Sequence, residues 1–453
     1  MNLHFIAIGG SAMHSLAIVM NRLGHKVSGS DDSIFEPSKS NLKNAGLLPP
    51  SLGWFPDKID SEIDIVILGM HSQKDNPELL KAQYIGLNIQ SYPEFLSEIS
   101  RNKTKVVIAG SHGKTTITAM IIHVLKYHTI DIDFMVGAPQ MNINETLEIS
   151  EKNNFILIEG DEYLSSPIDS RPKFLWYKPE IALISGIAWD HVNVYPLFDE
   201  YIKQFNSFIS SIRPGGVLIF NEEDELLKEL VEKNSNLIKK IPYKIPSFFV
   251  DDGTTYLETP EGEIPLSIFG NHNLSNLSGA QWISQMMGVN SSDFYEAIPT
   301  FRGASKRLEC LAKGKTSLLF NDFAHAPSKV KATVDAVHNQ FFDFEITFCL
   351  ELHTFSSLNF DFLNQYFNTL KKSSNSIIYY NPIVLKNKTR RPISEDFIKD
   401  AFGDKSLKLF TDKNILLDHL LKKNYVKHVL VFMSSGSFGG MDWEKIKSHI
   451  RKF

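Results

Sequence analysis

The sequence VVIAGSHGKTT occupies residues 106–116. Four apolar residues, three of them β-branched, precede Gly110. A second glycine stands at Gly113, and an apolar helical pattern follows over residues 117–125. Glycines let successive backbone N–H groups turn toward phosphate oxygens, and the start of a helix favours negative charge. A strand, a glycine turn and a helix in this order predict a loop that binds the phosphates of a nucleoside triphosphate. The residues predicted to line it are Gly110, Ser111, His112, Gly113, Lys114, Thr115 and Thr116.

Lys114 and Thr115 bring reactive side chains to this loop. The Lys114 ammonium can reach the terminal phosphates, and the Thr115 hydroxyl can ligate Mg²⁺. The spacing differs from the common Walker loop, because Ile108 stands where that pattern has its first glycine. A chance Gly-Lys-Thr in an ordinary loop is the alternative, but the strand before it and the helix after it favour the triphosphate site.

Length, charge and cysteine content limit the class of protein. The 453 residues predict about three domains at roughly 150 residues each. With 47 Lys and Arg against 52 Asp and Glu, the net charge is −5, which argues against a nucleic-acid partner but permits a local phosphate pocket. The two cysteines exclude a disulfide framework and a thiol-rich metal site. Without a basic leader or an apolar run of ~18 residues, we expect a cytoplasmic protein with no membrane span.

The first segment of the chain, residues 1–102, alternates short apolar runs with amphipathic stretches. Strands are predicted at 3–8 and 63–68, and helices at 12–23 and 77–84. This βαβ rhythm is typical of a parallel, Rossmann-like sheet.

Two further segments complete a predicted α/β fold of three domains. Residues 103–300 open with a strand at 105–109 and contain a Thr-, Gly- and Pro-rich stretch at 248–268, which predicts a small strand-rich insertion in a P-loop ATPase-like parallel-sheet domain. Residues 301–453 resume the alternation and predict a C-terminal Rossmann-like α/β domain. Its elements are expected as strands at 318–320, 346–350 and 429–432, with helices after Pro327 and from Met441. Hinges near residues 100 and 300 suggest that the predicted domains can close on one another.

Acidic residues follow the next apolar strand after the glycine loop. The sequence EGDEY covers residues 159–163, and a second strand at 181–185 leads to His191. The carboxyl ends of parallel strands meet at one edge of the sheet, so the Thr115 hydroxyl, the Glu159 carboxylate and the His191 imidazole should converge. Such a set suits Mg²⁺ when water and phosphate fill the other positions. An isolated histidine is more often a structural residue, but this position favours a ligand. Asp161 and Glu162 are either solvated or hold the loop.

These motifs, in this order, resemble the Mur ligases over essentially the whole chain. The resemblance implies an ATP- and Mg²⁺-dependent enzyme that joins an amino acid or peptide to a muramyl carboxylate. Glu159 and His191 fall on the family's two metal-associated positions. Asn206 replaces the carbamylated lysine of several members, and the branches that act on UDP-N-acetylmuramate itself also lack that lysine.

The resemblance also assigns residues beyond the loop. Asn273 and Asn276, in FGNHNLSN at 269–276, fall on the adenine-recognition element, although asparagine is also a favoured helix cap. Arg307 matches an arginine that approaches phosphate. In NDFAHAP at 321–327, Asp322 would contact the ribose and His325 would lie near the reacting centre. The residues expected to act in catalysis are Lys114, Glu159, His191, Arg307 and His325.

A glycine turn at Gly9-Gly10 follows the first strand, and Asp31 stands 21 residues after Gly10. This spacing suggests a dinucleotide fold, but the third glycine of that fingerprint is missing. The resemblance instead implies that residues 1–102 bind the UDP-sugar, residues 103–300 bind ATP and residues 301–453 bind the incoming amine. The UDP-sugar candidates are Gly10, Ser11, Met13, Ser30, Asp31, His71 and Ser72.

Two branches of the family have an N-terminal domain of this type. One adds L-alanine to UDP-N-acetylmuramate, and the other adds the tripeptide L-alanyl-γ-D-glutamyl-meso-diaminopimelate during peptidoglycan recycling and cell-wall synthesis. The turn FMSSGSFGGM at 432–441 resembles the tripeptide branch, and ELHTFSS at 351–357 lacks the Pro-His-Arg-Tyr pattern of the alanine branch. We therefore favour the tripeptide, with L-alanine as the alternative.

Other classes of protein stay open at this point. A nucleotide-dependent switch could use the same loop, but its release of ADP would not depend on an acceptor such as UDP-N-acetylmuramate. An oxidoreductase could use the N-terminal turn, but the triphosphate loop would then be superfluous. Folate-type polyglutamate ligation is disfavoured by the nucleotide-sugar domain. The oligomeric state is left open.

Overall fold

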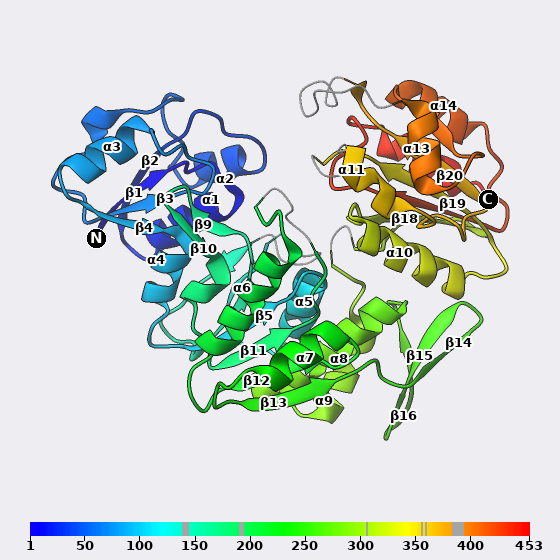
Figure 1. The fold of residues 1–453 in the computed structure, drawn as a ribbon, viewed down its shortest axis with the longest axis horizontal. Helices are drawn as coiled ribbons and strands as arrows, with labels where there is room; N and C mark the ends of the chain where they lie inside the picture. The colour runs from blue at the N-terminus through cyan, green and yellow to red at the C-terminus, as the bar shows by residue number, and fades with distance from the viewer. Residues whose placement is uncertain (138–144, 190–193, 305–306, 355–356, 358–359, 383–393) are drawn as a thin grey trace. The chain divides into compact units, whose positions relative to one another are not determined.

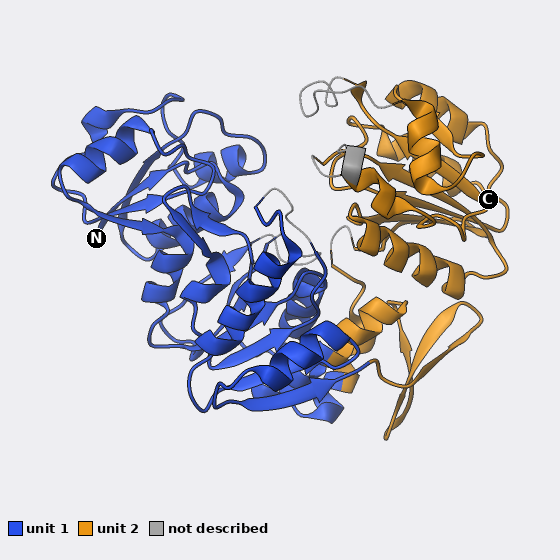
Figure 2. Cartoon of the chain, viewed as in Figure 1, with its two compact units in different colours: residues 1–244, 279–294 blue, residues 245–278, 295–453 orange. Residues whose placement is uncertain are grey.

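A computed structural model describes residues 1–453 except 138–144, 190–193, 305–306, 355–356, 358–359 and 383–393 (Figure 1). The chain folds into two compact units. The first unit contains residues 1–244 and 279–294, and the second contains residues 245–278 and 295–453 (Figure 2). The division passes through helices α8 (Asn271–Met286) and α9 (Ser291–Ala297). The predicted α/β class is confirmed, because the large sheets are mostly parallel and helices pack on them. The domain boundaries near residues 102 and 300 stay a prediction.

The N-terminal sheet has four parallel strands in the order β2-β1-β3-β4. Strand order reverses between β1 and β3, which is where open α/β sheets bind their ligands, beyond the carboxyl ends of the strands. The elements are β1 (Asn2–Ile6), α1 (Ser11–Arg22), β2 (Lys26–Ser30), α2 (Ser38–Asn44), η1 (Pro56–Lys58), β3 (Ile65–Leu68), α3 (Pro77–Tyr84), β4 (Asn88–Ser91) and α4 (Tyr92–Ile99). The predicted helices are confirmed, and β1 ends before the predicted residue 8 because Ala7 has a φ of 67°.

The central sheet has seven strands in the order β13-β12-β11-β5-β8-β6-β7, and its only antiparallel pair is β6 with β7 among the described residues. Strand β5 is fully buried along most of its length and lies between β8 and β11, so the loops after these three strands share one edge. The strands are β5 (Thr104–Ala109), β6 (Asp133–Met135), β7 (Leu147–Glu148), β8 (Phe155–Glu159), β11 (Ile181–Ile184), β12 (Val217–Asn221) and β13 (Lys239–Tyr243). The other elements are α5 (Lys114–Tyr127), the hairpin of β9 (Leu164–Ser166) and β10 (Asp169–Pro172), η2 (Lys173–Trp176), α6 (Phe198–Ser211) and α7 (Glu225–Lys233).

The second unit is built on a six-stranded sheet in the order β17-β18-β22-β19-β20-β21, in which only β17 pairs antiparallel among the described strands. The predicted strand-rich insertion is confirmed as an antiparallel sheet of β14 (Phe248–Asp251), β15 (Thr254–Thr259) and β16 (Gly262–Leu266). The strands of the large sheet are β17 (Glu309–Lys313), β18 (Ser317–Asp322), β19 (Glu345–Glu351), β20 (Asn375–Tyr379), β21 (Lys408–Phe410) and β22 (His428–Met433). Its helices are η3 (Ile298–Thr300), α10 (Pro327–Gln340), α11 (Phe360–Leu363), η5 (Asn364–Tyr366), α13 (Glu395–Phe402), α14 (Lys413–Leu421) and α15 (Trp443–Ile450). None of the helices that the structure describes has the length and apolar character needed to cross a bilayer.

His428, on β22, is expected to make the stability of this unit depend on pH. It is 2% exposed, and burial lowers its pKa to about 4, with Glu345 opposing the shift and Lys423 adding to it. The unfolded chain has a histidine pKa near 6.5, so it binds more protons than the folded chain between pH 6.5 and 4. The free energy of unfolding should therefore fall as the pH drops through this window, by up to about 3 kcal/mol. Thermal midpoints at pH 7 and 5 should differ less in His428→Gln than in the wild type, and an equal difference would contradict this.

Candidate active site

The glycine loop after β5 has the conformation that its sequence predicts. Gly110 has a φ of 124°, and Gly113 has a φ of 82° and is the N-cap of α5. A Cβ atom at Gly110 would lie 2.1 Å from the Ser185 hydroxyl, so no other residue fits there without a shift of the backbone. Because Gly113 caps the helix, α5 begins at Lys114 rather than at the predicted residue 117.

Lys114 is held on the loop by two acceptors. Its Nζ atom donates to the Gly110 carbonyl at 2.6 Å and to the Glu162 carboxylate at 2.6 Å. Burial alone would lower the pKa of Lys114, but the charges of Glu162, Asp161 and Glu159 raise it above its ordinary value. Lys114 is therefore a fixed positive charge at the carboxyl edge of the central sheet.

Thr115 and Glu159 meet beside Lys114. The Thr115 hydroxyl donates to Glu159 Oε1 at 2.7 Å, and the Gly137 N–H donates to Glu159 Oε2 at 2.8 Å. A hydroxyl and a carboxylate at this distance are the oxygen ligands that Mg²⁺ prefers, so the two residues fit the predicted metal site. Within the described residues no group of three or more His, Cys, Asp or Glu side chains could hold a metal. His191, the third predicted ligand, lies outside the described residues.

The other predicted loop residues tie the turn to the sheet. The Ser111 N–H donates to the Gly186 carbonyl at 3.0 Å, and the Ser185 hydroxyl donates to the His112 carbonyl. The His112 ring lies against the Ser111 carbonyl, with Nδ1 at 2.7 Å, and Thr116 is buried in the first turn of α5. The residues after β11 therefore form the wall against which the loop packs.

Glu162 is a site residue whose role the sequence left open. It is fully buried, and besides its ion pair with Lys114 it accepts a hydrogen bond from the Tyr201 hydroxyl at 3.0 Å. Asp161 is engaged elsewhere, in an ion pair with Lys173 at 2.6 Å. Burial would raise the pKa of Asp161, but Lys173 and Lys114 lower it below its ordinary value. The place of Glu162 in the acidic run is a signal for it, whereas nothing in the sequence singles out Tyr201.

The N-terminal glycine turn is stabilised by Asp31. The Gly9 N–H donates to Asp31 Oδ2 at 2.7 Å, and the Ser33 N–H donates to Oδ1 at 3.2 Å. Burial raises the pKa of Asp31, although these two N–H groups lower it. Asp31 thus shapes the turn that was predicted to hold the uridine diphosphate. Of the other candidates there, Met13 and Ser30 are buried and Ser11 is exposed.

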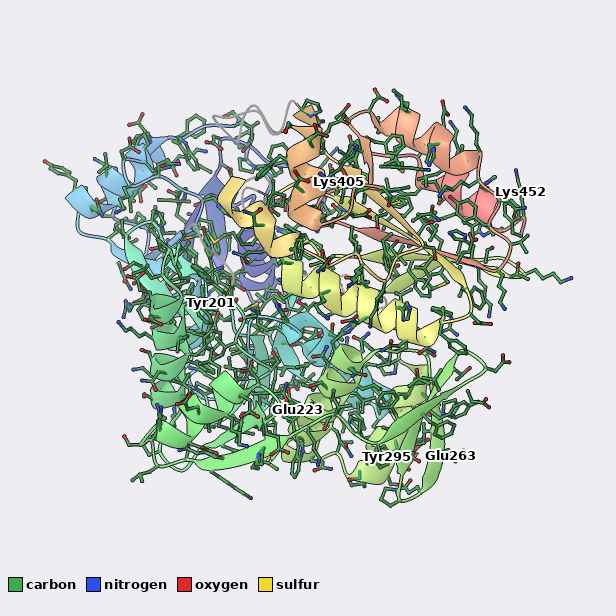
Figure 3. The ribbon with its side chains drawn as sticks, turned by 45° about the vertical axis from the view of Figure 1, so that its right-hand side comes forward. Tyr201, Glu223, Glu263, Tyr295, Lys405 and Lys452 are labelled. Carbon is green, nitrogen blue, oxygen red and sulfur yellow. The ribbon has the colours of Figure 1, made fainter. Side chains whose placement is uncertain are left out.

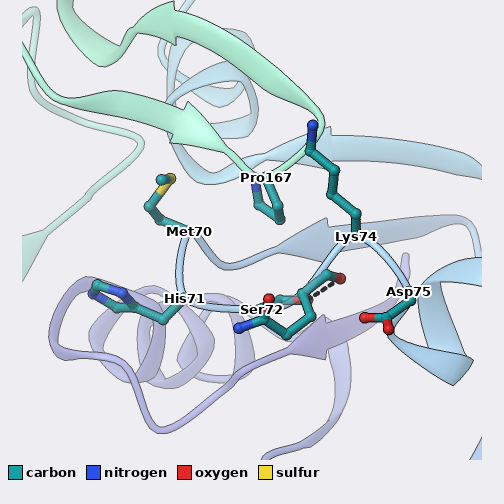
Figure 4. A pocket seen from close by; sticks show the side chains of 7 residues that line it. Met70, His71, Ser72, Lys74, Asp75 and Pro167 are labelled. Atoms are coloured by element: carbon teal, nitrogen blue, oxygen red, sulfur yellow. Dashed lines mark hydrogen bonds between the residues drawn. The ribbon is translucent and has the colours of Figure 1, made fainter. Parts of the chain in front are cut away.

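A pocket of about 500 Å³ opens at the carboxyl end of β3 (Figure 4). The segment after β3 begins beside the end of β1, because the Gly69 N–H donates to the carbonyl of Ile6, the last residue of β1, at 2.9 Å. The predicted residues His71 and Ser72 both line the pocket, and Pro167, from the turn of the β9–β10 hairpin, also lines it. The lining residues are Met70, His71, Ser72, Gln73, Lys74, Asp75 and Pro167. Gly10 belongs to the turn after β1 and caps α1, and Ser11 is the first residue of that helix.

The second unit gathers another group of predicted residues at the end of β18. Asp322 accepts hydrogen bonds from the Thr333 hydroxyl at 2.9 Å and from the Ala324 N–H at 3.0 Å. Burial raises the pKa of Asp322, although the charge of Arg307 lowers it. The Arg307 guanidinium lies 4.9 Å from the centre of the Phe323 ring. His325 Nδ1 lies 2.8 Å from the Phe323 carbonyl, so this turn brings Arg307, Asp322 and His325 together.

The asparagines of α8 are both buried. The Asn273 side chain donates to the Phe269 carbonyl at 2.9 Å, and its backbone N–H donates to the Gly270 carbonyl at 2.9 Å. This bond ties Asn273 to the residue two positions before α8, and it differs from an N-cap bond, in which the side chain accepts from a backbone N–H. Asn276 is 7% exposed. Their contact with adenine stays a prediction.

Comparison with known proteins gives the family. Residues 2–104 match the "Mur ligase family, catalytic domain" and residues 108–283 match the "Mur ligase middle domain". UDP-N-acetylmuramate–L-alanine ligase of Carboxydothermus hydrogenoformans is 30% identical over 346 residues, which cover 74% of this chain and 72% of that protein. UDP-N-acetylmuramate-alanine ligase of Thermotoga maritima has the same fold, with a TM-score of 0.71 at 19% identity. A murein peptide ligase of Psychrobacter arcticus also has this fold, with a TM-score of 0.68 at 23% identity. Each structural match covers 100% of this chain and 99% of the other.

Proposed function

Because this chain belongs to the Mur ligase family, whose members are ATP-dependent amide ligases of peptidoglycan synthesis, we propose that it joins UDP-N-acetylmuramate to the tripeptide L-alanyl-γ-D-glutamyl-meso-diaminopimelate. The observation that carries the ligase activity is the Lys114 ammonium, held on the glycine loop next to the Thr115–Glu159 pair. A fixed cation and a set of oxygen ligands are what the transfer of a phosphoryl group requires of a protein.

The choice of the tripeptide depends on the turn at residues 432–441. Buried Glu351, at the end of β19, accepts hydrogen bonds from the Ser434 hydroxyl and, at 2.9 Å, from the Phe438 N–H. A Cβ atom at Gly436 would lie 2.7 Å from the Glu351 carboxylate. These contacts support a specific role for the glycines that resemble the tripeptide branch. The L-alanine ligase is the second candidate, and the Carboxydothermus hydrogenoformans relative favours it.

The reaction needs no nucleophile from the protein. The muramyl carboxylate attacks the γ-phosphorus of ATP and gives an acyl phosphate and ADP. The α-amine of the incoming peptide then attacks the activated carbonyl, and the tetrahedral intermediate expels phosphate. Catalysis is therefore largely positioning and charge neutralisation, with water excluded from the acyl phosphate.

Residues of this chain take the following roles in the proposed reaction. Lys114 and Arg307 offset the charge of the phosphates, and His325 orients or deprotonates the amine. Thr115 and Glu159, together with His191, would hold Mg²⁺, which supplies positive charge beside the phosphates. Adenine would bind at Asn273 and Asn276, and the ribose at Asp322. We assign the UDP-sugar to residues 1–102, ATP to 103–300 and the incoming amine to 301–453.

One assay separates the two candidate substrates. ADP release should be measured with ATP, Mg²⁺ and UDP-N-acetylmuramate, and the tripeptide compared with L-alanine at equal concentration. We expect at least about a tenfold higher kcat/KM with the tripeptide, because contacts to the added residues raise transition-state binding. A preference for L-alanine would favour the second candidate. ADP release that neither amine stimulates would contradict the ligase function itself.

A further inference from the structure

A chain of hydrogen bonds runs from the glycine loop through α6 and back to the loop. The Ser111 hydroxyl lies 2.8 Å from the hydroxyl of Tyr201, which stands on α6 (Figure 3). The Tyr201 hydroxyl donates to Glu162 Oε1 at 3.0 Å, and Glu162 Oε2 accepts from Lys114 Nζ at 2.6 Å. Lys114 Nζ also donates to the Gly110 carbonyl at 2.6 Å. Both ends of the chain therefore lie within the same turn.

The direction of each hydrogen bond follows from the number of donors. Tyr201 has one hydroxyl proton, which goes to the carboxylate, so Ser111 must donate to Tyr201. Ser111 Oγ in turn accepts from the Ala188 N–H at 2.9 Å. The chain is thus oriented from a backbone N–H to a carboxylate, and such charge-assisted networks are stronger than neutral ones.

The middle of this hydrogen-bond chain is buried and packed against aromatic rings. Tyr201 is fully buried, and its ring centre lies 5.3 Å from that of Phe205 and 5.4 Å from that of Tyr195. The Tyr195 hydroxyl donates to the Glu162 carbonyl at 2.7 Å, so both the backbone and the side chain of Glu162 are anchored. Glu162 itself is fully buried.

Lys114 has three N–H donors, and two of them have partners among the described residues, Gly110 and Glu162. Two fixed acceptors determine the direction of the third donor. A lysine side chain otherwise loses about 2 kcal/mol of rotamer entropy when a ligand orders it. The Glu162 carboxylate removes that cost before the nucleotide arrives, which is preorganisation of a charge for the transition state.

We propose that Glu162 and Tyr201 are positioning residues of the ligase, which orient the third N–H of Lys114 toward the phosphoryl group in transfer. Glu162 acts through Lys114, and Tyr201 acts through Glu162. The inference rests on the proposed function, because the step that it accelerates is the phosphorylation of the sugar carboxylate. It assigns the effect of both residues to kcat, whereas the backbone of the loop supplies most of the binding of ATP.

The test compares Tyr201→Phe, Glu162→Gln and the double variant in the ADP-release assay, with kcat and the KM for ATP measured separately. Tyr201→Phe keeps the packing of the ring and removes the hydroxyl. Tyr177→Phe is the matched control, because Tyr177 is fully buried in the same unit and its hydroxyl has no partner among the described residues. Affinity for a non-hydrolysable ATP analogue and the thermal midpoint of each variant show whether the loop and the fold are intact.

We expect kcat to fall about tenfold in Tyr201→Phe and about a hundredfold in Glu162→Gln, with KM for ATP within about threefold of the wild type. In the Glu162→Gln background the Tyr201→Phe change should cost less than about twofold, since it acts through the carboxylate. Tyr177→Phe should leave kcat unchanged. The positioning role would be overturned by a normal kcat in Tyr201→Phe, or by a higher kcat or tighter analogue binding in Glu162→Gln. Losses of kcat that add up in the double variant would also overturn it. These outcomes would leave the proposed ligase function standing. A wild-type protein without acceptor-dependent ADP release would overturn the proposed function as well.

Discussion

Replacing Lys114 with alanine is expected to abolish ADP release, lowering kcat by about a thousandfold or more. The ammonium is the cation that the structure fixes on the glycine loop, and the substitution also leaves the buried Glu162 carboxylate without its ion pair. The muramyl carboxylate and the γ-phosphate are both negative, so without this cation their approach is opposed by charge repulsion. Initial rates of ADP release, with UDP-N-acetylmuramate and the tripeptide both present, measure the effect.

The Lys114→Ala variant should still bind the uridine nucleotide, because the predicted UDP-sugar residues belong to the N-terminal sheet. Binding of UDP-N-acetylmuramate by calorimetry is expected within about threefold of the wild type. Lys452→Ala is the control for loss of one lysine, since Lys452 is exposed near the end of the chain (Figure 3). Turnover in Lys114→Ala equal to that of the control would remove the loop from the mechanism.

Replacing Glu159 with glutamine is expected to lower kcat by about a hundredfold and to raise the Mg²⁺ concentration needed for half-maximal activity by about tenfold. Glutamine keeps the size of the side chain and can accept the Thr115 hydrogen bond, but it lacks the charge that Mg²⁺ prefers. ADP release measured over a series of Mg²⁺ concentrations shows both effects. Removal of Mg²⁺ with a chelator should abolish turnover in every variant.

Glu148→Gln is a suitable control for this change, because Glu148 is exposed on β7 of the same sheet. Its Mg²⁺ dependence should match that of the wild type. If Glu159→Gln showed the same Mg²⁺ dependence as the control, the Thr115–Glu159 pair would be a structural hydrogen bond and the metal would have to bind elsewhere.

The parts of the fold that could be predicted are those with a local signal. The glycine loop, the βαβ alternation and the strand-rich insertion each show in the order of glycines and apolar residues, and the structure contains all three. Element ends were less predictable. The left-handed Gly113 starts α5 at Lys114, three residues before the apolar pattern begins. The positive φ of Ala7 ends β1 early, and an alanine gives no sign of that conformation in the sequence.

The partners of the site residues could not be predicted, because they lie far apart along the chain. Lys114 and Glu162 are 48 positions apart, and Ser111 and Tyr201 are 90 apart. These pairs form only when β5, β8 and α6 are brought together by the fold. For the same reason the sequence does not reveal that Asp31 accepts a hydrogen bond from the Gly9 N–H.

In the proposed reaction the triphosphate of ATP binds at the bend between β5 and α5, where the carboxylate of the sugar is phosphorylated. A crystal structure of the protein with UDP-N-acetylmuramate and a non-hydrolysable ATP analogue tests it most directly. We expect the β- and γ-phosphates within hydrogen-bonding distance of Lys114 Nζ and of the loop N–H groups, with the muramyl carboxylate facing the γ-phosphorus. An analogue bound in another cleft, with the loop empty, would contradict it.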